Sequence, residues 1–302
     1  MATTPTEADL INAQPQRLPG WLRKTTTFLA ILIVLCLLWE GYKAIGLATG
    51  DKIPFTNTPL PIRSDDSSMP HLGDIVGALF LPAQRGNDTT VIAILFQSAL
   101  FTWREAIVGF LIGSLVGFTL GVMFSRWQLL ERGLMPYVVA SQTVPLLAIA
   151  PMVVIWGSQL GWDTWVAVTI ISAYLTFFPV TINTLRGLRS PDPTSVELMR
   201  SYAAPEWQVL WKLRVPAALP YIFTALKISA TASVIGAIIG ELPSGIAEGL
   251  GRVLLTYSYH YVSGPEKLYA AIIMSAFLGI AFTSLIILIE RIVVPAQRRI
   301  SD

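Results

Sequence analysis

The chain has 302 residues, of which 53% are hydrophobic and only 13% are charged, and its mean hydropathy is +0.61. Soluble domains carry roughly 25% charged residues, so this composition excludes an ordinary soluble protein and indicates a polytopic membrane protein. A net charge of +2 without a basic run argues against nucleic-acid binding. One cysteine, Cys36, and two distant histidines, His71 and His260, offer neither a disulfide framework nor a metal cluster.

A polar leader precedes the first apolar run. Residues 1–24 are polar, contain several prolines and lack hydrophobic periodicity, which predicts a disordered cytoplasmic tail. The next run predicts a first membrane helix over residues 25–47, which reaches the roughly 20 residues that a bilayer needs. A cleaved secretory signal is the alternative, but Glu40-Gly41-Tyr42-Lys43 is a poor cleavage site.

The remaining chain alternates between one long polar loop and several apolar runs. Residues 48–92 are rich in Pro, Asp, Ser and Asn and predict a periplasmic loop. Residues 93–294 form the membrane core, followed by a short cytoplasmic tail at 295–302. With the first helix, about six spans are expected in an all-α protein. The core spans are expected near 106–124, 137–156, 165–185, 221–242 and 268–294.

Basic residues set the orientation, because loops rich in Lys and Arg stay in the cytoplasm. Placing both termini inside collects most of the Lys and Arg residues on one side, whereas the opposite loops dilute theirs with Asp and Glu. This orientation puts the loop 186–220 in the cytoplasm and predicts a multi-pass protein of the cell (inner) membrane.

Within that loop, residues 192–220 form a charged, amphipathic stretch between two apolar blocks. Thr194 followed by Glu197 fits a capping box and predicts a short helix from about Ser195. Pro205 disfavours a helical residue before it and suits the first position of a new helix. We therefore expect two short helices with an elbow between them.

The second of these helices has an apolar stripe. Trp207, Leu210 and Trp211 recur at i, i+3 and i+4 among charged residues, and Pro216 and Pro220 are expected to close the stretch before the next span. Such a pair of helices either lies on the lipid surface or docks on a soluble partner. Interfacial helices are usually Lys/Arg-rich on the polar face, so this mixture of acidic and basic residues favours a partner.

The stretch resembles the cytoplasmic EAA loop of permease subunits in binding-protein-dependent ABC importers, most closely the nitrate/sulfonate/taurine branch. Glu197 takes the Glu position of that loop, and residues 213–216, Leu-Arg-Val-Pro, take its closing quartet. Leu198 and Met199 replace the two usual alanines, and Ala203 replaces a glycine. Because a left-handed alanine costs on the order of 1 kcal/mol, Ala203 predicts an elbow that turns by another geometry around Pro205.

The resemblance implies a type I ABC importer permease fold and a transport subunit rather than an enzyme. It also implies three kinds of protein partner beside membrane lipid: an ABC ATPase subunit dimer, a periplasmic or lipid-anchored solute-binding protein, and a second permease subunit. A homodimer of permeases is the simpler pairing, and a heterodimer stays open. The chain has no Gly-rich phosphate loop, so no cofactor is expected on it, and ATP would be bound by the partner.

The loop 186–220 would be the coupling loop, with its short helices seated on the ATPase. Glu197 is either a capping carboxylate or an ion-pair partner for an arginine of the ATPase, and the two roles are compatible. The residues expected to couple to the ATPase are Glu197, Leu198, Met199, Tyr202, Ala203, Ala204, Pro205, Trp207, Trp211 and Pro216.

Two further groups are candidate functional residues. Small and polar residues on the third and fifth spans nominate a pathway lining, although each one alone is more typical of close helix packing. The loop after the fifth span resembles the region where relatives close the path and meet the binding protein, but its carboxylates are equally consistent with solvated charges. The pathway candidates are Gln142, Thr143, Ser229, Thr231, Ser233 and Gly236, and the outer gate candidates are Glu241, Glu248 and Gly249.

Two other classes of protein are compatible with a polytopic chain of this length. A secondary transporter or channel working without ATP would place a carboxylate or an inverted repeat at mid-membrane. Glu105 falls near an expected span end and beside Arg104, which predicts a local ion pair instead. A membrane-embedded enzyme would need a convergent His, Cys or carboxylate cluster, which the sequence does not suggest. The transported solute, a small organic molecule or an oxyanion, is not specified by these residues.

Overall fold

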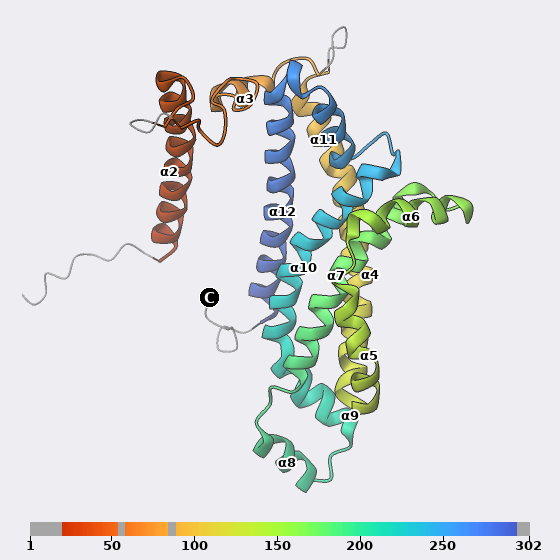
Figure 1. The fold of residues 1–302 in the computed structure, drawn as a ribbon. Coiled ribbons are helices and arrows are strands. Elements are labelled where there is room, and N and C mark those ends of the chain that lie inside the picture. The colour runs from red at the N-terminus through yellow and green to blue at the C-terminus, as the bar shows by residue number, and fades with distance from the viewer. Residues whose placement is uncertain (1–19, 54–57, 84–88, 295–302) are drawn as a thin grey trace, which may run out of the picture. The chain divides into compact units, whose positions relative to one another are not determined.

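The computed structural model of the protein describes residues 20–53, 58–83 and 89–294 (Figure 1). Helices account for most of these residues, and the extended pairing among them is limited to two isolated bridges, Lys52–Pro59 and Pro82–Thr90. The expected all-α class is confirmed. The predicted disordered tail at 1–24 was wrong for residues 20–24, which are helical, and lies outside the described residues over 1–19; the predicted tail at 295–302 also lies outside them.

The chain divides into two units, residues 1–74 and 75–302. In the first unit, α2 (Gly20–Thr49) exposes its apolar side chains, as a lipid-facing helix does. The segment after α2 is fastened to it, because the buried Lys43 donates hydrogen bonds to Asp66 Oδ1 at 2.5 Å and to the Met69 carbonyl at 2.6 Å. The Lys43 ammonium lowers the pKa of the Asp66 carboxyl.

The second unit is a helical bundle. Between α3 (Leu72–Ala78), which begins in the first unit, and the last described residue, it contains a series of long and short helices. They are α4 (Val91–Arg126), α5 (Gln128–Ser141), α6 (Leu146–Gln159), α7 (Thr164–Leu188), α8 (Pro193–Ser201), α9 (Glu206–Gln208), the π-helix η1 (Val209–Arg214), α10 (Val215–Ser244), α11 (Leu250–Tyr259), the 3₁₀-helix η2 (Tyr261–Ser263) and α12 (Pro265–Val293).

Helix α7 is the centre of this bundle, with α4 and α10 packed closely against it. A row of glycines at every fourth position of α4 faces α7. A Cβ at Gly113 would lie 2.5 Å from the Ala173 carbonyl oxygen, and one at Gly117 would lie 2.5 Å from that of Phe177. Small residues let two helix backbones approach closely, which is the packing that membrane helices use. The interior between α4 and α7 is therefore filled by backbone and small side chains.

Among the described residues, five helical segments are long and apolar enough to cross a membrane, or six if one bent pair counts as a span. The expected number of spans is therefore confirmed if the bent pair counts as one span, but several boundaries were wrong. Helix α4 begins at Val91 rather than near Ala106, because Glu105 is buried inside the bundle instead of ending the span.

The predicted continuous third span is broken. Helices α5 and α6 meet at 98°. Pro145 lies at the start of α6, has no amide hydrogen to donate and disfavours a helical residue before it, so the helix stops at Ser141 and restarts beyond the proline.

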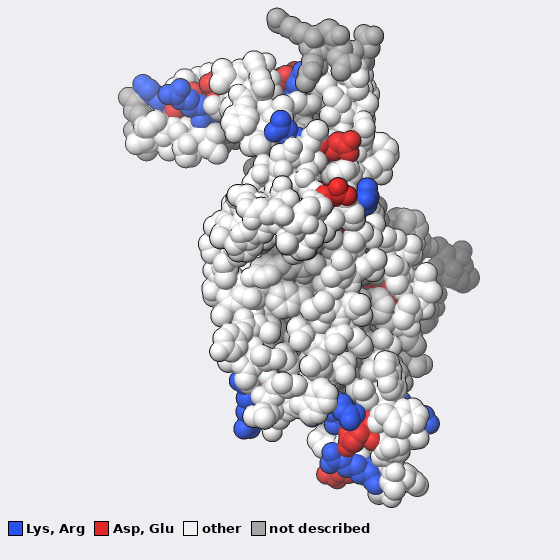
Figure 2. Space-filling view, turned by 90° about the vertical axis from the view of Figure 1, so that its right-hand side faces the viewer, with Lys and Arg blue, Asp and Glu red and all other residues white. Residues whose placement is uncertain are grey.

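Charged residues avoid the middle of the bundle. Figure 2 shows Lys, Arg, Asp and Glu side chains at the end that carries α8 and α9 and again toward the opposite end, with a broad zone of uncharged surface between them. We call the end that carries α8 and α9 the inner end, following the predicted orientation, and the end that carries α11 the outer end.

Candidate functional site

The inner end is built around α8, which starts differently from the prediction. Asp192, not Thr194, is the N-cap, and its Oδ1 accepts a hydrogen bond from the Thr194 amide at 3.2 Å. Pro193 follows as the first helical residue, a position where its missing N–H is not needed. The proposed Thr194–Glu197 capping box was therefore wrong, and the pattern Asp192-Pro193 was the signal that should have been used.

The elbow after α8 uses the left-handed conformation that Ala203 was expected to avoid. Ala203 has φ +50°. Its amide donates to the Arg200 carbonyl at 2.9 Å, and the Ala204 amide donates to the Met199 carbonyl at 3.0 Å, which together make a Schellman motif. These two hydrogen bonds satisfy carbonyl groups at the end of α8. Their stabilisation offsets the strain of holding an alanine, with its Cβ, in the left-handed conformation.

Beyond Pro205, the chain stays helical through the predicted stop. Helix α9, the π-helix η1 and α10 form one uninterrupted segment from Glu206 to Ser244. Pro216 lies in the first turn of α10 and Pro220 inside it, so neither ends the segment. The side chain of Leu210 faces inward and packs with Leu188 and Ala218. The elbow is thus attached to the bundle through Leu210.

Val209 is buried like Leu210, but the large aromatic side chains of the elbow point away from the bundle. Helix α8 has no buried residue, and Tyr202 is 80% exposed. Trp207 and Trp211 are 57% and 56% exposed. Glu197, Leu198, Ala203 and Pro205 are also exposed, whereas Met199, Ala204 and Pro216 are half-buried. The candidate coupling residues therefore form a surface with exposed aromatic rings, which we call the elbow surface.

Two ion pairs border the elbow surface. Arg200 of α8 lies 3.7 Å from Glu206 of α9, across the elbow. In the second ion pair, the guanidinium of Arg189, at the end of α7, donates hydrogen bonds to both carboxylate oxygens of Glu131 on α5. A two-pronged Arg–carboxylate contact fixes geometry as well as charge. The Arg189–Glu131 pair therefore fixes the end of α7, from which the chain continues into the elbow, to α5.

Three of the pathway candidates lie in the packed interior. Ser229 Oγ donates to the Thr176 carbonyl at 3.3 Å, and Ser172 Oγ donates to the Ser233 carbonyl at 2.9 Å. A Cβ at Gly236 would lie 2.8 Å from the Ser172 Cα. In this structure Ser229, Ser233 and Gly236 join α10 to α7. They therefore serve close helix packing, the alternative to a pathway lining.

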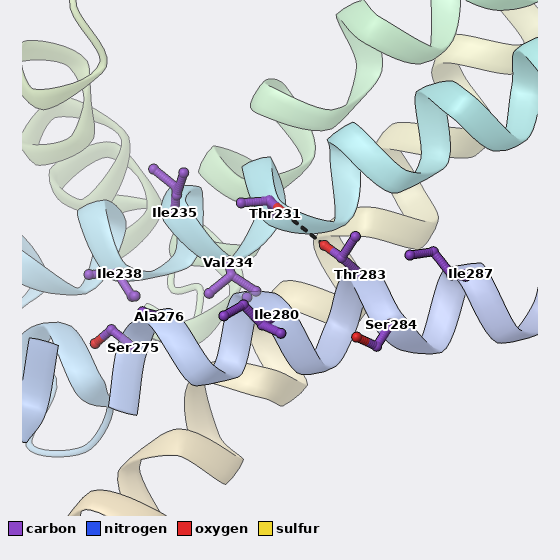
Figure 3. Close-up of a pocket in the computed structure, with 11 residues that line it drawn as sticks. Thr231, Val234, Ile235, Ile238, Ser275, Ala276, Ile280, Thr283, Ser284 and Ile287 are labelled. Atoms are coloured by element: carbon purple, nitrogen blue, oxygen red, sulfur yellow. Dashed lines mark hydrogen bonds between the residues drawn. The ribbon is translucent and has the colours of Figure 1, made fainter. Parts of the chain in front are cut away.

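The other three candidates are on the surface. Gln142 and Thr143 are exposed at the bend between α5 and α6. Thr231 of α10 shares a 2.8 Å hydrogen bond with Thr283 of α12. This pair lies in a groove of about 630 Å³ between the two helices, whose other walls include Ile235 and Ile280 (Figure 3). Surface and interior candidates are therefore separated, and none of them lines an enclosed channel within the described part of one subunit.

At the outer end, α4, α10 and α11 meet around Glu241, which is the one acidic residue of α10. Its carboxylate is fully buried and accepts hydrogen bonds from Thr102 Oγ1 of α4 at 2.6 Å and from the Gly251 amide of α11 at 2.5 Å. Thr102 Oγ1 in turn accepts from the Leu250 amide at 2.9 Å. Glu241 thus ties α4 and α11 to α10, and its side chain does not reach the surface in this structure.

Glycines make this closure sterically possible. Gly249 has φ +97°, and a Cβ there would lie 2.6 Å from Glu241 Oε2. Gly245, at the end of α10, is left-handed in open space. Glu248 is exposed, so among the outer gate candidates it is the one available to a partner. Thr102 could not be predicted from the sequence as the partner of Glu241, because the two residues are 139 positions apart along the chain.

Comparisons with known proteins place this architecture. Residues 109–301 match the family described as "Binding-protein-dependent transport system inner membrane component". The chain belongs to this family. It is therefore a permease subunit of an ATP-driven importer and a multi-pass membrane protein, and ATP hydrolysis is performed by a separate ATPase subunit.

Two relatives illustrate the match. The formylaminopyrimidine transport permease protein ThiX of Halalkalibacterium halodurans is 36% identical over 68% of this chain and 81% of its own. The putative aliphatic sulfonates transport permease protein SsuC of Bacillus subtilis is 27% identical over 95% of this chain and 92% of its own. The predicted family, including its sulfonate and nitrate types, is confirmed.

Solved structures agree on the fold. A chain of the MetNI methionine ABC transporter in an inward-facing conformation aligns with a TM-score of 0.54 at 18% identity, over 65% of this chain and 95% of its own. A chain of an amino acid ABC transporter aligns with a TM-score of 0.54 at 18% identity, over 66% and 94%. The predicted type I importer fold is confirmed by these alignments.

Proposed function

We propose that the elbow surface is the site where the ATPase subunit docks, and that Glu206–Ser244 carries its motion into the membrane core. The observation that supports this most directly is the continuous helical segment that begins at the elbow. Trp207 and Trp211 are exposed on its first turns, whereas Leu210 anchors the same turns to the bundle. Aromatic side chains are enriched at protein–protein interfaces, and a force applied to this surface would act on α10 directly.

Glu197 contributes an exposed carboxylate to the same surface. Because Asp192 supplies the cap of α8, the capping role of Glu197 is not needed, and its charge is free to face a basic residue of the ATPase. In this proposal ATP is bound by the partner alone, with no cofactor on the permease.

The experiment is co-purification of the tagged permease with the ATPase subunit from cell membranes. Glu197→Arg and the double variant Trp207→Ala/Trp211→Ala are expected to lose the ATPase. Trp127→Ala is the matched control, because Trp127 is 54% exposed and lies between α4 and α5, outside the elbow. Retention of the ATPase by both elbow variants would refute the docking site.

The transport path is proposed to form between two copies of the permease. The interior of one subunit is filled by close packing of α4, α7 and α10, so polar side chains that meet a solute have to lie on its surface. Gln142, Thr143 and Thr231 fulfil this condition, whereas Ser229, Ser233 and Gly236 would act only by holding the helices together.

Cross-linking tests this pairing. In a Cys36→Ser background, Thr143→Cys is expected to give a disulfide-linked dimer in membranes. Leu115→Cys is the control, since Leu115 is exposed on α4 among apolar residues. Cross-linking at Leu115 but not at Thr143 would contradict the proposal.

The proposed solute is a small organic molecule or oxyanion delivered by a binding protein. The names of three relatives support this size class, because they describe permeases for formylaminopyrimidine, aliphatic sulfonates and nitrate. We further propose that both termini and the elbow face the cytoplasm, which the gathering of Lys and Arg at the inner end supports.

A further inference from the structure

The outer end contains a second buried carboxyl group beside Glu241. Glu105 of α4 is fully buried, one helical turn after Thr102, and its carboxyl group faces that of Glu241. Neither oxygen of Glu105 accepts a hydrogen bond from a described donor. An unpartnered buried carboxylate is among the most costly groups that a protein interior can hold.

The neighbouring positive charge does not cancel this cost, although Arg104 acts favourably on the Glu105 carboxylate. Arg104 is next in sequence, but its guanidinium lies over the ring of Trp165, 4.5 Å from the centroid, so the expected local ion pair with Glu105 was wrong. Helix α11 contributes the Gly251 amide to Glu241, and the Arg252 side chain of the same helix is exposed. Two carboxylates would then face each other without a cation between them, where like charges repel strongly.

A single proton would give Glu105 a hydrogen-bond partner and would remove the repulsion between the two carboxylates. We propose that Glu105 and Glu241 form a proton-binding site, in which a protonated Glu105 donates a hydrogen bond to the carboxylate of Glu241. Glu105 then has a partner, and the pair carries one negative charge instead of two. Glu241 keeps its ionised form, which suits an acceptor of bonds from Thr102 and from the Gly251 amide.

In this proposal the proton helps to hold together the junction of α4, α10 and α11 at the outer end. Glu241 ties α4, α10 and α11 together, and Glu105 holds the carboxylate of Glu241 from the α4 side. Losing the proton would put two charges into this junction and push them apart. A metal ion is the other way to neutralise two carboxylates, but among the described residues no group of three or more acidic, His or Cys side chains converges here.

Infrared spectroscopy of the purified full-length permease in dodecyl maltoside, a detergent without carbonyl groups, tests the proposal directly. The wild type is expected to show the carbonyl band of a protonated carboxyl group at neutral pH. Glu105→Gln is expected to lose this band and to fold normally, because the Gln amide donates the same hydrogen bond. Glu248→Gln, which removes an exposed carboxylate of the same loop, is the matched control and keeps the band.

The pH dependence of unfolding gives a second readout. The folded wild type would bind one proton more than its unfolded chain, so its unfolding temperature is expected to fall as the pH rises from neutral to alkaline. In Glu105→Gln this fall is expected to be smaller. A wild type without the band, a band that persists in Glu105→Gln, or an unfolding temperature that rises with sodium instead of acid would each overturn the proposal.

Discussion

The inner and outer ends of the bundle both reverse the chain through a residue in the left-handed conformation, but they treat side chains in opposite ways. At the inner end the residue is Ala203, and the aromatic rings around it point into open space. At the outer end the residues are Gly245 and Gly249, and the Glu241 carboxylate fills the space beside Gly249. The inner reversal leaves its side chains exposed, as the proposed docking site requires, whereas the outer one packs against its own chain and leaves no room for a side chain at Gly249.

The most disruptive change should be Gly249→Ala. It adds a Cβ against Glu241 at a positive φ, so steric overlap and backbone strain together should lower the free energy of unfolding by about 3 kcal/mol. Gly245→Ala is the matched control, since open space surrounds that position and only backbone strain of about 1 kcal/mol is expected. Thermal unfolding of the purified permease measures both, and equal effects would contradict the proposed fit around Glu241.

Removing the hydroxyl of Thr102 should have the next largest effect. Thr102→Val keeps the shape but leaves Glu241 Oε1 and the Leu250 amide short of a partner in a buried site, which should cost about 2 kcal/mol. Thr119→Val on the same helix is the control, because Thr119 is exposed and bonds only the Leu115 carbonyl. A loss of stability no greater than that of the control would show that the junction is not held through Thr102.

At the inner end the corresponding change should stabilise the protein. Ala203→Gly relieves the strain of a left-handed alanine, partly offset by the greater freedom of glycine in the unfolded chain, for a net gain of about 0.5 kcal/mol. Ala204→Gly, one residue further on and without a positive φ, should instead lower stability slightly. The difference between the unfolding temperatures of the two variants measures the strain, and a destabilised Ala203→Gly would argue against it.

The smallest effect on folding is expected from Trp207→Ala. Its ring is exposed, so the free energy of unfolding should change by no more than about 0.5 kcal/mol. Leu210→Ala, on the same turn but buried against Leu188 and Ala218, should cost about 2 kcal/mol or more. If denaturation of the isolated permease gave the two variants equal losses, the elbow surface would not be free for a partner.

Much of the bundle could be predicted because hydrophobic runs of membrane length report directly on spans. The errors came where burial overrides local pattern. Arg104 and Glu105 look like the end of an apolar run, yet α4 continues through them because their side chains find places inside the bundle or over Trp165. Pro216 and Pro220 look like helix stops, yet the first turn of a helix and a membrane core both accommodate proline.

The candidate site was predictable where its residues are consecutive and not where they meet across the fold. The sequence located the elbow through Glu197, Pro205 and the tryptophans, but the conformation of Ala203 depends on hydrogen bonds that propensity alone does not reveal. Glu241 was nominated from its loop, whereas Thr102 and Glu105 become its neighbours only when α4 packs beside α10.

The uninterrupted segment from Glu206 to Ser244 has a geometric consequence for both ends. Its 39 residues correspond to a helical path about 58 Å long, with the tryptophans near its start and Glu241 near its end. If the segment turns as one body about its midpoint, a tilt of about 10° displaces each end by up to about 5 Å in opposite directions. A displacement of that size exceeds the length of a hydrogen bond. A tilt of the segment that begins at the tryptophans would therefore be sufficient to break the hydrogen bond between Glu241 and Thr102.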